Sequence, residues 1–161
     1  ICFVKDNDYA NYVKRHSNTS IKEGNFVDTK GNVLGRHKGI VNYTIGQRKG
    51  LGIAFGKPMF VIDINAKNNT VILGDNSDLF QYNLIAKDVN FISIEDIKEP
   101  IRVKAKVRYA AKPADATVYK VAEDKIKIVF DEAQRAITKG QSVVMYDGDK
   151  VVGGGIIESS F

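Results

Sequence analysis

The sequence predicts a mainly β protein, built from a small β-rich domain with one short helix and a following six-stranded β-barrel. Short apolar runs separated by Gly, Asn and Asp recur along the chain, which is typical of strands joined by tight turns. No long segment keeps the 3.6-residue period of a helix. In the second half the runs are evenly spaced, a pattern that favours a small closed barrel or a sandwich.

The first part of the chain is expected to hold one helix and two strand pairs. Asp6-Asn7-Asp8 offers capping side chains for a short helix that ends near His16, with Tyr9, Tyr12 and Val13 on one face. The strand pairs are predicted at 25–28 with 32–34, around the turn Thr29-Lys30-Gly31, and at 59–64 with 70–73.

The second part is expected to form the barrel. Its strands are predicted at about 85–91, 101–109, 116–121, 125–130, 142–146 and 151–157. Gly74 to Asp78 is the most linker-like stretch, so we place the two domains at 1–74 and 75–161. Gly153-Gly154-Gly155, inside the last strand, predicts a bulge or a close backbone approach that serves barrel closure.

Charge and composition narrow the classes of function. The 24 Lys and Arg residues exceed the 19 Asp and Glu residues, and this net charge of +5 favours anionic partners. No apolar run approaches the roughly 20 residues that span a bilayer, so no membrane partner is expected. Cys2, His16 and His37 match no familiar zinc spacing, and one cysteine forms no internal disulfide. We therefore expect no metal and a reducing, cytoplasmic compartment.

The segment from Tyr43 to Ile53 fits neither a helical nor a strand period. Its three glycines surround Gln47, Arg48 and Lys49, so we expect a shaped loop whose amide and two cations point outward toward a polyanion. The alternative is a plain glycine-rich connection with solvated basic residues. The segment continues into a strand-like run after Lys57-Pro58 rather than a helix, which excludes a mononucleotide-binding loop.

The predicted strand 101–109 alternates apolar and basic residues, so one face packs in the core and the other carries a row of cations. Their spacing of about 6.6 Å resembles that of successive phosphates in an extended strand. A solvated face that protects an edge is the alternative. The core-facing residues are Val103, Ala105 and Val107, and the row is Arg102, Lys104, Lys106 and Arg108.

Two further features have open interpretations. Residues 131–141 are expected to connect two strands and to end in a Lys-Gly-Gln turn, where Gln141 has no priority over Gln134 as a contact for RNA. Cys2 is the one intrinsically nucleophilic residue, but a thiol in Ile-Cys-Phe-Val is also typical of a buried structural cysteine.

Short segments spread over the whole chain occur in a recognisable order. They are Ile1-Cys2-Phe3, Gly24-Asn25-Phe26-Val27, Gly35-Arg36-His37-Lys38-Gly39, Tyr43 to Ile53, Phe130-Asp131-Glu132 and Gly153-Gly154-Gly155-Ile156-Ile157. In order and spacing they closely resemble the bacterial tRNA-specific 2-thiouridylases, the MnmA family. The resemblance implies a C-terminal part of such an enzyme, with a central domain and a barrel similar to those of translation elongation factors.

The resemblance also implies a reaction. Enzymes of this family use ATP to adenylate the C2 oxygen of wobble uridine 34 in tRNA and then replace that oxygen with sulfur. Cys2, by its place in the Ile-Cys-Phe motif, would take up a persulfide and attack the activated carbon. The ATP-binding domain and the partner cysteine, which closes a disulfide with Cys2, would precede Ile1. This chain alone is therefore expected to be inactive.

The tRNA contacts that the resemblance implies fall on Arg108, Tyr109 and Gln141. To these we add Lys106 from the basic row, and Arg48 and Lys49 as candidates for shaping the uridine pocket beside Cys2. Lys139 departs from the proline common in the family, which is expected to loosen its turn. The segment from Ala110 to Pro113 also departs from the family, whose members usually carry more polar or basic residues there. This departure puts contacts beyond Tyr109 in doubt.

The partners that the resemblance implies are tRNAs for Lys, Glu and Gln, together with a sulfur-carrier protein or a cysteine desulfurase. The first alternative is a noncatalytic RNA-binding β-barrel module in which Cys2 is structural. A plain interaction domain without an RNA role is the other alternative.

Overall fold

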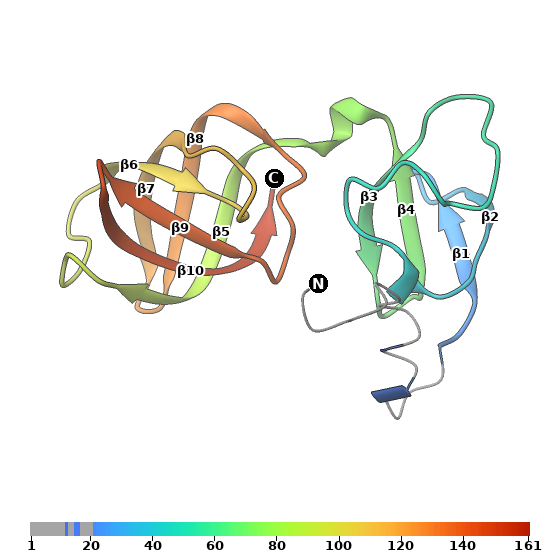
Figure 1. Cartoon of the computed structure of the whole chain (residues 1–161), viewed down its shortest axis with the longest axis horizontal. Helices are drawn as coiled ribbons and strands as arrows, with labels where there is room; N and C mark the ends of the chain where they lie inside the picture. Colours follow the sequence, from blue (N-terminus) through green and yellow to red (C-terminus); the bar gives the residue numbers. More distant parts are fainter. Residues whose placement is uncertain (1–11, 13–14, 17–20) are drawn as a thin grey trace. The chain divides into compact units, whose positions relative to one another are not determined.

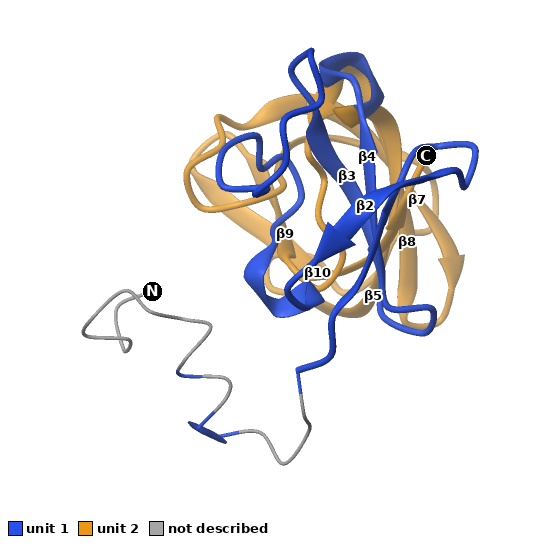
Figure 2. Ribbon diagram, turned by 90° about the vertical axis from the view of Figure 1, so that its right-hand side faces the viewer, with its two compact units in different colours: residues 1–78 blue, residues 79–161 orange. Residues whose placement is uncertain are grey.

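The computed structural model describes residues 12, 15, 16 and 21–161, which form two compact units, residues 1–78 and residues 79–161 (Figures 1 and 2). Tyr12, Arg15 and His16 are helical, and the Tyr12 carbonyl lies 2.8 Å from His16 Nδ1. Most of the short helix predicted from Asp6 onward lies outside the described residues.

The first unit is built on a four-stranded sheet in the order β2-β1-β4-β3 (Figure 1). Its strands are β1 (Gly24–Val27), β2 (Val33–His37), β3 (Phe60–Asn65) and β4 (Thr70–Gly74). The β1–β2 and β3–β4 pairs are antiparallel, which confirms both predicted strand pairs, and β1 runs parallel to β4. A 3-10 turn, η1 (Ile40–Asn42), leads into the glycine-rich segment.

The core of this unit forms around Phe26 on β1. Its ring meets those of His37, Tyr43 and Phe55 edge to face, with centroids 5.5, 5.1 and 6.3 Å away. Edge-to-face pairs at this spacing are favoured because the positive edge of one ring meets the negative face of another. Tyr43 and Phe55 belong to the segment between β2 and β3, so this core holds that segment against the sheet.

The second unit is a closed antiparallel barrel with the strand order β10-β5-β8-β7-β6-β9, which follows η2 (Asn76–Leu79). Its strands are β5 (Phe80–Phe91), β6 (Ile101–Lys106), β7 (Ala114–Ala122), β8 (Lys125–Arg135), β9 (Ser142–Asp147) and β10 (Lys150–Ser160). All six predicted strands are present, and the closed barrel is confirmed over the alternative of a sandwich.

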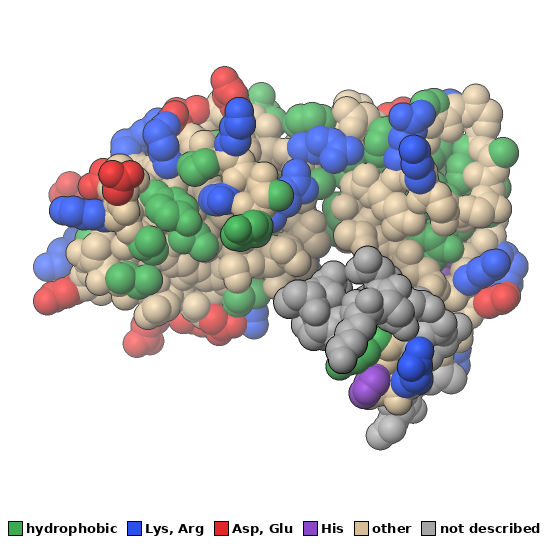
Figure 3. All heavy atoms as spheres, in the orientation of Figure 1, with side chains coloured by type: hydrophobic (Ala, Val, Ile, Leu, Met, Phe, Trp, Pro, Cys, Tyr) green, Lys and Arg blue, Asp and Glu red, His purple; other side chains and the backbone are tan. Residues whose placement is uncertain are grey.

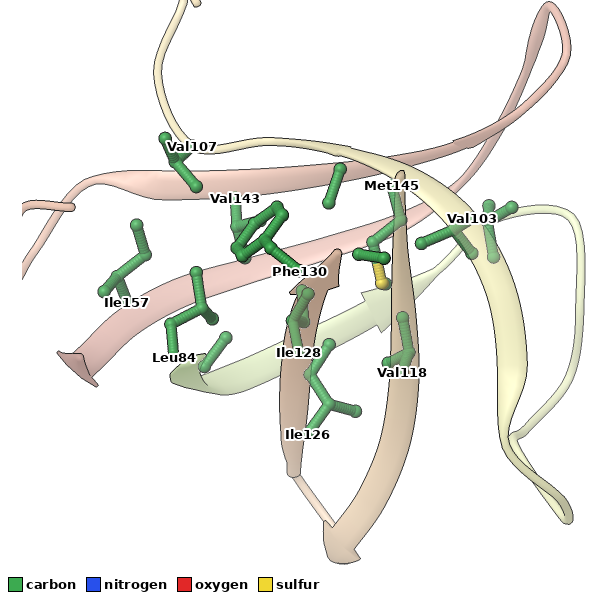
Figure 4. Close-up of a cluster of buried hydrophobic side chains, with 14 of the residues drawn as sticks. Leu84, Val103, Val107, Val118, Ile126, Ile128, Phe130, Val143, Met145 and Ile157 are labelled. Carbon is green, nitrogen blue, oxygen red and sulfur yellow. The ribbon is translucent and has the colours of Figure 1, made fainter. Parts of the chain in front are cut away.

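Alternate side chains of the barrel strands fill its interior (Figure 4). Val103 and Ala105 of β6 are buried, as the alternation predicts, and Val107 is buried just beyond the strand. Each fully buried Val, Ile or Leu side chain contributes about 1.5–3 kcal/mol through loss of apolar surface from water. The side chains labelled in Figure 4 are Leu84, Val103, Val107, Val118, Ile126, Ile128, Phe130, Val143, Met145 and Ile157.

β10 closes the barrel because it pairs with β5 on one side and β9 on the other. The predicted close approach at its glycines is confirmed. A Cβ on Gly153 would lie 2.5 Å from the Asn90 carbonyl oxygen, and one on Gly154 would lie 2.6 Å from that of Val143. Register shifts near these glycines bend the strand.

Four predicted boundaries in the barrel are wrong by three residues or more. β5 begins at Phe80 rather than near Ile85, and β10 continues to Ser160 rather than ending near Ile157. β6 ends at Lys106 rather than continuing to Tyr109. β8 continues to Arg135, so residues 131–135 belong to a strand and not to a connection. The extension exists because Gln134 and Arg135 pair with Gln81 and Phe80 of β5. A partner strand distant in sequence leaves no local signal in the charged run that begins at Asp131.

No helix in the described part of the chain is long and apolar enough to cross a membrane.

Candidate nucleic-acid interface

The barrel topology gathers four of the predicted contact residues at one end of the second unit. β6 and β9 are antiparallel, with Lys106 opposite Val144, so the end of β6 lies beside the start of β9. The loop after β6 carries Arg108 and Tyr109, and the loop before β9 carries Gln141. Lys106, Arg108, Tyr109 and Gln141 therefore lie at the same end of the barrel.

Tyr109 and Lys106 contact each other at this end. The Lys106 ammonium lies 5.4 Å from the centre of the Tyr109 ring, a cation–π contact. Tyr109 is nevertheless 96% exposed, so its ring is open to stacking by a base. Arg108 is exposed as well. Among the residues that the structure describes, neither Lys106 nor Arg108 forms an ion pair, which leaves both charges available to phosphate.

The predicted row of free cations is only half correct. Arg102 donates two hydrogen bonds to the Asp131 carboxylate, at 2.8 and 2.6 Å, and Lys104 Nζ lies 2.9 Å from both oxygens of Asp115. The hydrogen-bonded Arg102 holds the pKa of Asp131 below its ordinary value, and Asp131 raises that of Arg102. The acidic partners stand on β7 and β8, and strand alternation in β6 does not reveal them.

Gln141 stands in a turn that is fixed to β10. The Gly140 amide donates to the Ile157 carbonyl, and the Ile157 amide donates to the Gln141 carbonyl, both at 2.8 Å. Gly140 has a φ of 83°, a backbone conformation that glycine adopts without strain. The backbone on either side of Gln141 is therefore held in place, while its side chain is exposed.

A cleft of ≈ 550 Å³ lies beside Arg108, between the β6–β7 loop and the end of β8. Sequence reasoning did not single out Lys112 as a contact residue, and it gave Gln134 no structural role. Both line this cleft: Lys112 lies in the β6–β7 loop, and Gln134 lies in the part of β8 beyond the predicted strand end. The lining residues are Val107, Arg108, Ala111, Lys112, Pro113, Ala114, Asp115, Asp131, Glu132, Gln134 and Arg135.

The glycine-rich segment of the first unit is a shaped loop, as predicted, but Gln47 does not point outward. Its side-chain oxygen accepts from the Thr44 amide, and its NH₂ donates to the Lys49 carbonyl, both at 3.0 Å. The Gly46 amide donates to the Val61 carbonyl at 2.8 Å and ties the loop to β3. The hydrogen bonds of the Gln47 side chain therefore stabilise the conformation of its own loop.

Arg48 and Lys49 are exposed at this loop. A shallow groove of ≈ 420 Å³ begins at Arg48 and is also lined by Lys57, Phe55 and Met59. Because Lys57 Nζ lies 2.8 Å from Asp75 Oδ1, its charge is already paired, and Arg48 is the lining cation that a phosphate could meet. Cys2 lies outside the described residues, so the structure does not place it relative to this groove.

His37 fixes the strand end from which the glycine-rich segment departs. It is 1% exposed, and its Nδ1 accepts from the Gly39 amide at 3.0 Å. Because Nδ1 accepts, the neutral ring carries its proton on Nε2, which donates to the Asn69 carbonyl at 3.2 Å. Burial lowers the pKa of His37 below 6.5, since the protonated ring would lose water without gaining an acidic partner.

Basic and acidic side chains are interspersed over the visible face of the barrel, so no patch of a single sign covers it (Figure 3). Whether a cation on this face is available to a phosphate therefore depends on the charged side chains next to it. In the described part of the chain, no group of three His, Cys, Asp or Glu side chains could hold a metal ion.

Comparison with known proteins defines the class. Residues 81–157 match the model of the aminomethyltransferase beta-barrel domain, and residues 10–75 match that of the tRNA methyl transferase PRC-barrel domain. Both models are named after group-transfer enzymes, and one of these names refers to tRNA. Fold and models together thus place the chain among the β domains of such enzymes.

Curated relatives narrow the class to one family. The chain is 78% identical over 160 residues to a tRNA-specific 2-thiouridylase MnmA of Clostridioides difficile. The aligned region covers 99% of this chain and 44% of that relative. It is 60% identical over 158 residues to the protein of that name from Acetivibrio thermocellus, and this alignment covers 98% of the chain and 44% of the relative. The chain is closely similar to these tRNA-specific 2-thiouridylases over almost all of its residues, and it spans less than half of their length.

The buried, neutral His37 predicts a pH-dependent stability of the first unit. Its folded-state pKa is lowered, so its contribution is fully present above the unfolded pKa of 6.5 and is lost as pH falls through the folded pKa. We expect the melting temperature of this unit to fall over that range. His37→Gln should flatten the profile, whereas His16→Gln, at the exposed histidine, should not. A flat profile for the unaltered protein would contradict this account.

Proposed function

We propose that the chain forms the C-terminal part of a tRNA-uridine 2-sulfurtransferase, which thiolates C2 of uridine 34 in an ATP-dependent reaction. The observation that carries this proposal is the 78% identity to a tRNA-specific 2-thiouridylase over 99% of the chain. In this proposal residues 1–74 are the central domain with the attacking Cys2, and residues 75–161 are a tRNA-binding barrel. The setting is cytoplasmic.

Cys2 is proposed to carry the sulfur as a persulfide. The terminal sulfur attacks C2 of the adenylated uridine, and AMP leaves with the oxygen. The thiolate of a second cysteine, outside this chain, then attacks the Cys2 sulfur and forms a disulfide, which leaves the terminal sulfur on the base. A persulfide suits this role because it is a better nucleophile near neutral pH than an unperturbed thiol.

ATP is not expected to bind to the residues described here. A phosphate-binding loop of the common kind ends in a helix whose N-terminal amides face the phosphates. The glycine-rich loop instead leads to β3, and its Gly46 amide already donates to the Val61 carbonyl. We therefore assign ATP binding to a part of the enzyme beyond this chain.

The end of the barrel is proposed to bind tRNA. Lys106 and Arg108 supply charge for phosphates, Tyr109 supplies an exposed ring for stacking, and Gln141 supplies an amide on a fixed turn. Stacking and backbone charge suit a single-stranded anticodon loop, whose bases can be splayed out without breaking a duplex. The proposed substrates are tRNAs for Lys, Glu and Gln, and a carrier protein or a cysteine desulfurase donates the sulfur.

Arg108 provides a direct test of the barrel's role. Arg108→Gln should weaken binding of a transcript tRNA and reduce the magnitude of the salt slope by about one, because one phosphate contact is lost. Lys150→Gln serves as the control, since it removes the same charge at the other end of the barrel. Fluorescence anisotropy over a range of salt concentrations measures both quantities. Equal slopes for the two variants would argue against the assignment.

Cys2 is tested in the complete enzyme. Cys2→Ser should abolish 2-thiouridine formation on transcript tRNA while tRNA binding, followed in the same samples, stays intact. The serine hydroxyl accepts no persulfide, so the chemical step is lost without loss of the binding surface. Thiolation that survives would favour the alternative of a noncatalytic RNA-binding module.

Arg48 and Lys49 are proposed to shape the uridine pocket. In the complete enzyme Arg48→Ala should lower tRNA affinity or turnover about tenfold, the effect of losing a charged contact worth about 1.4 kcal/mol. Lys67→Ala, at an exposed position of the β3–β4 turn, is the matched control. If affinity and turnover are both unchanged in Arg48→Ala, the loop has no part in the pocket.

A further inference from the structure

The cleft beside Arg108 has an unusual charge arrangement. Three cations, Arg108, Lys112 and Arg135, face three acids, Asp115, Asp131 and Glu132. Taken alone, this lining has no net charge and gives a phosphate no reason to enter. The two aspartates, however, are already paired with cations that stand outside the cleft.

Arg102 and Lys104 of β6 supply these outside partners. Arg102 holds Asp131 with two parallel hydrogen bonds, and a further N–H bonds to the Thr117 hydroxyl at 2.9 Å. Lys104 holds both oxygens of Asp115. Neither cation lines the cleft. With these two partners counted, the charges of Asp131 and Asp115 are offset, and Arg108 and Lys112 stand against one acid, Glu132.

We propose that this cleft holds the sugar-phosphate backbone of the bound RNA, and that Arg102 and Lys104 act from outside the lining by neutralising Asp131 and Asp115. The proposal rests on the tRNA-binding function proposed above and adds a new surface to it. Arg108 and Lys112 are the cations that meet the phosphates. Arg102 and Lys104 are positioning residues, because their charges are directed at carboxylates rather than at RNA.

The cleft wall supports this division of roles. The Gln134 side chain donates to the Glu132 carbonyl at 2.9 Å, so it stabilises the end of β8. Glu132 is the lining acid whose side chain forms no ion pair within the described part of the chain. Its charge opposes a phosphate nearby, and the RNA backbone should therefore follow the side of the cleft formed by Arg108 and Lys112.

A double-mutant cycle on Arg102 and Asp131 separates this role from direct contact with RNA. Arg102→Gln leaves Asp131 uncompensated and should weaken transcript tRNA binding about three- to tenfold, the effect expected of one partly screened charge at close range. Asp131→Asn should tighten binding. The double variant Arg102→Gln/Asp131→Asn removes both charges, and its affinity should return to within about twofold of the unaltered chain.

The pair Lys104 and Asp115 offers an independent repeat with the same expected pattern. Lys125→Gln is the matched control, because Lys125 pairs with Glu158 at the opposite end of β8 and its loss should leave affinity unchanged. Circular dichroism and the melting temperature show whether each variant is folded. These ion pairs are exposed, so the folded state should survive their removal.

The outcomes distinguish the two proposals. A double variant that binds as weakly as Arg102→Gln would overturn the neutralising role and show that Arg102 contacts RNA directly. Unchanged affinity in both Arg102→Gln and Lys104→Gln would also overturn it, although tRNA binding by the barrel would stand. Absence of tRNA binding by the unaltered chain would instead reject the proposed function itself, and the inference with it.

Discussion

Closure of the barrel by β10 is the constraint on which the second unit depends. β10 must lie between β5 and β9, and its glycines allow the neighbouring carbonyls to approach to distances that a Cβ would not permit. Closure gives the backbone N–H and C=O groups of the edge strands hydrogen-bond partners and fixes the register of β9 against β6. That register brings the loops of Arg108 and Gln141 to one end. The apolar interior thus determines where the polar contact residues lie.

Electrostatics at that end depend on pairing more than on the number of cations. β6 carries three basic residues in alternation, Arg102, Lys104 and Lys106, but the first two face aspartates on neighbouring strands. Exposed pairs of this kind add little to folding stability. In our proposal their larger effect is on the local field, because each one offsets the charge of an aspartate that lines the cleft with Arg108. An ion pair with a small effect on stability can therefore still affect which ligands bind.

The sequence predicted the strands, the closed barrel and the buried face of β6 well, because alternation and turn residues are local signals. It did not predict that β8 extends to Arg135, because that extension depends on pairing with β5. The partners of Arg102 and Lys104 were missed for the same reason. Gln47 was expected to point outward, but its amide satisfies Thr44 and Lys49 within its own loop. The predictions for these polar side chains failed because their hydrogen-bond and ion-pair partners are not evident from the local sequence pattern.

The first unit relies on burial where the second relies on paired charge. His37 keeps a neutral ring in the core, where it accepts from Gly39 and donates to Asn69, so it links β2 to the turn before β4 without introducing a charge. The segment that follows η1 then packs Tyr43 and Phe55 on Phe26 and leaves Arg48 and Lys49 exposed. A loop with buried anchors loses little conformational entropy on binding, because its backbone is already ordered. Both units therefore carry exposed cations on backbone that the core has fixed in advance.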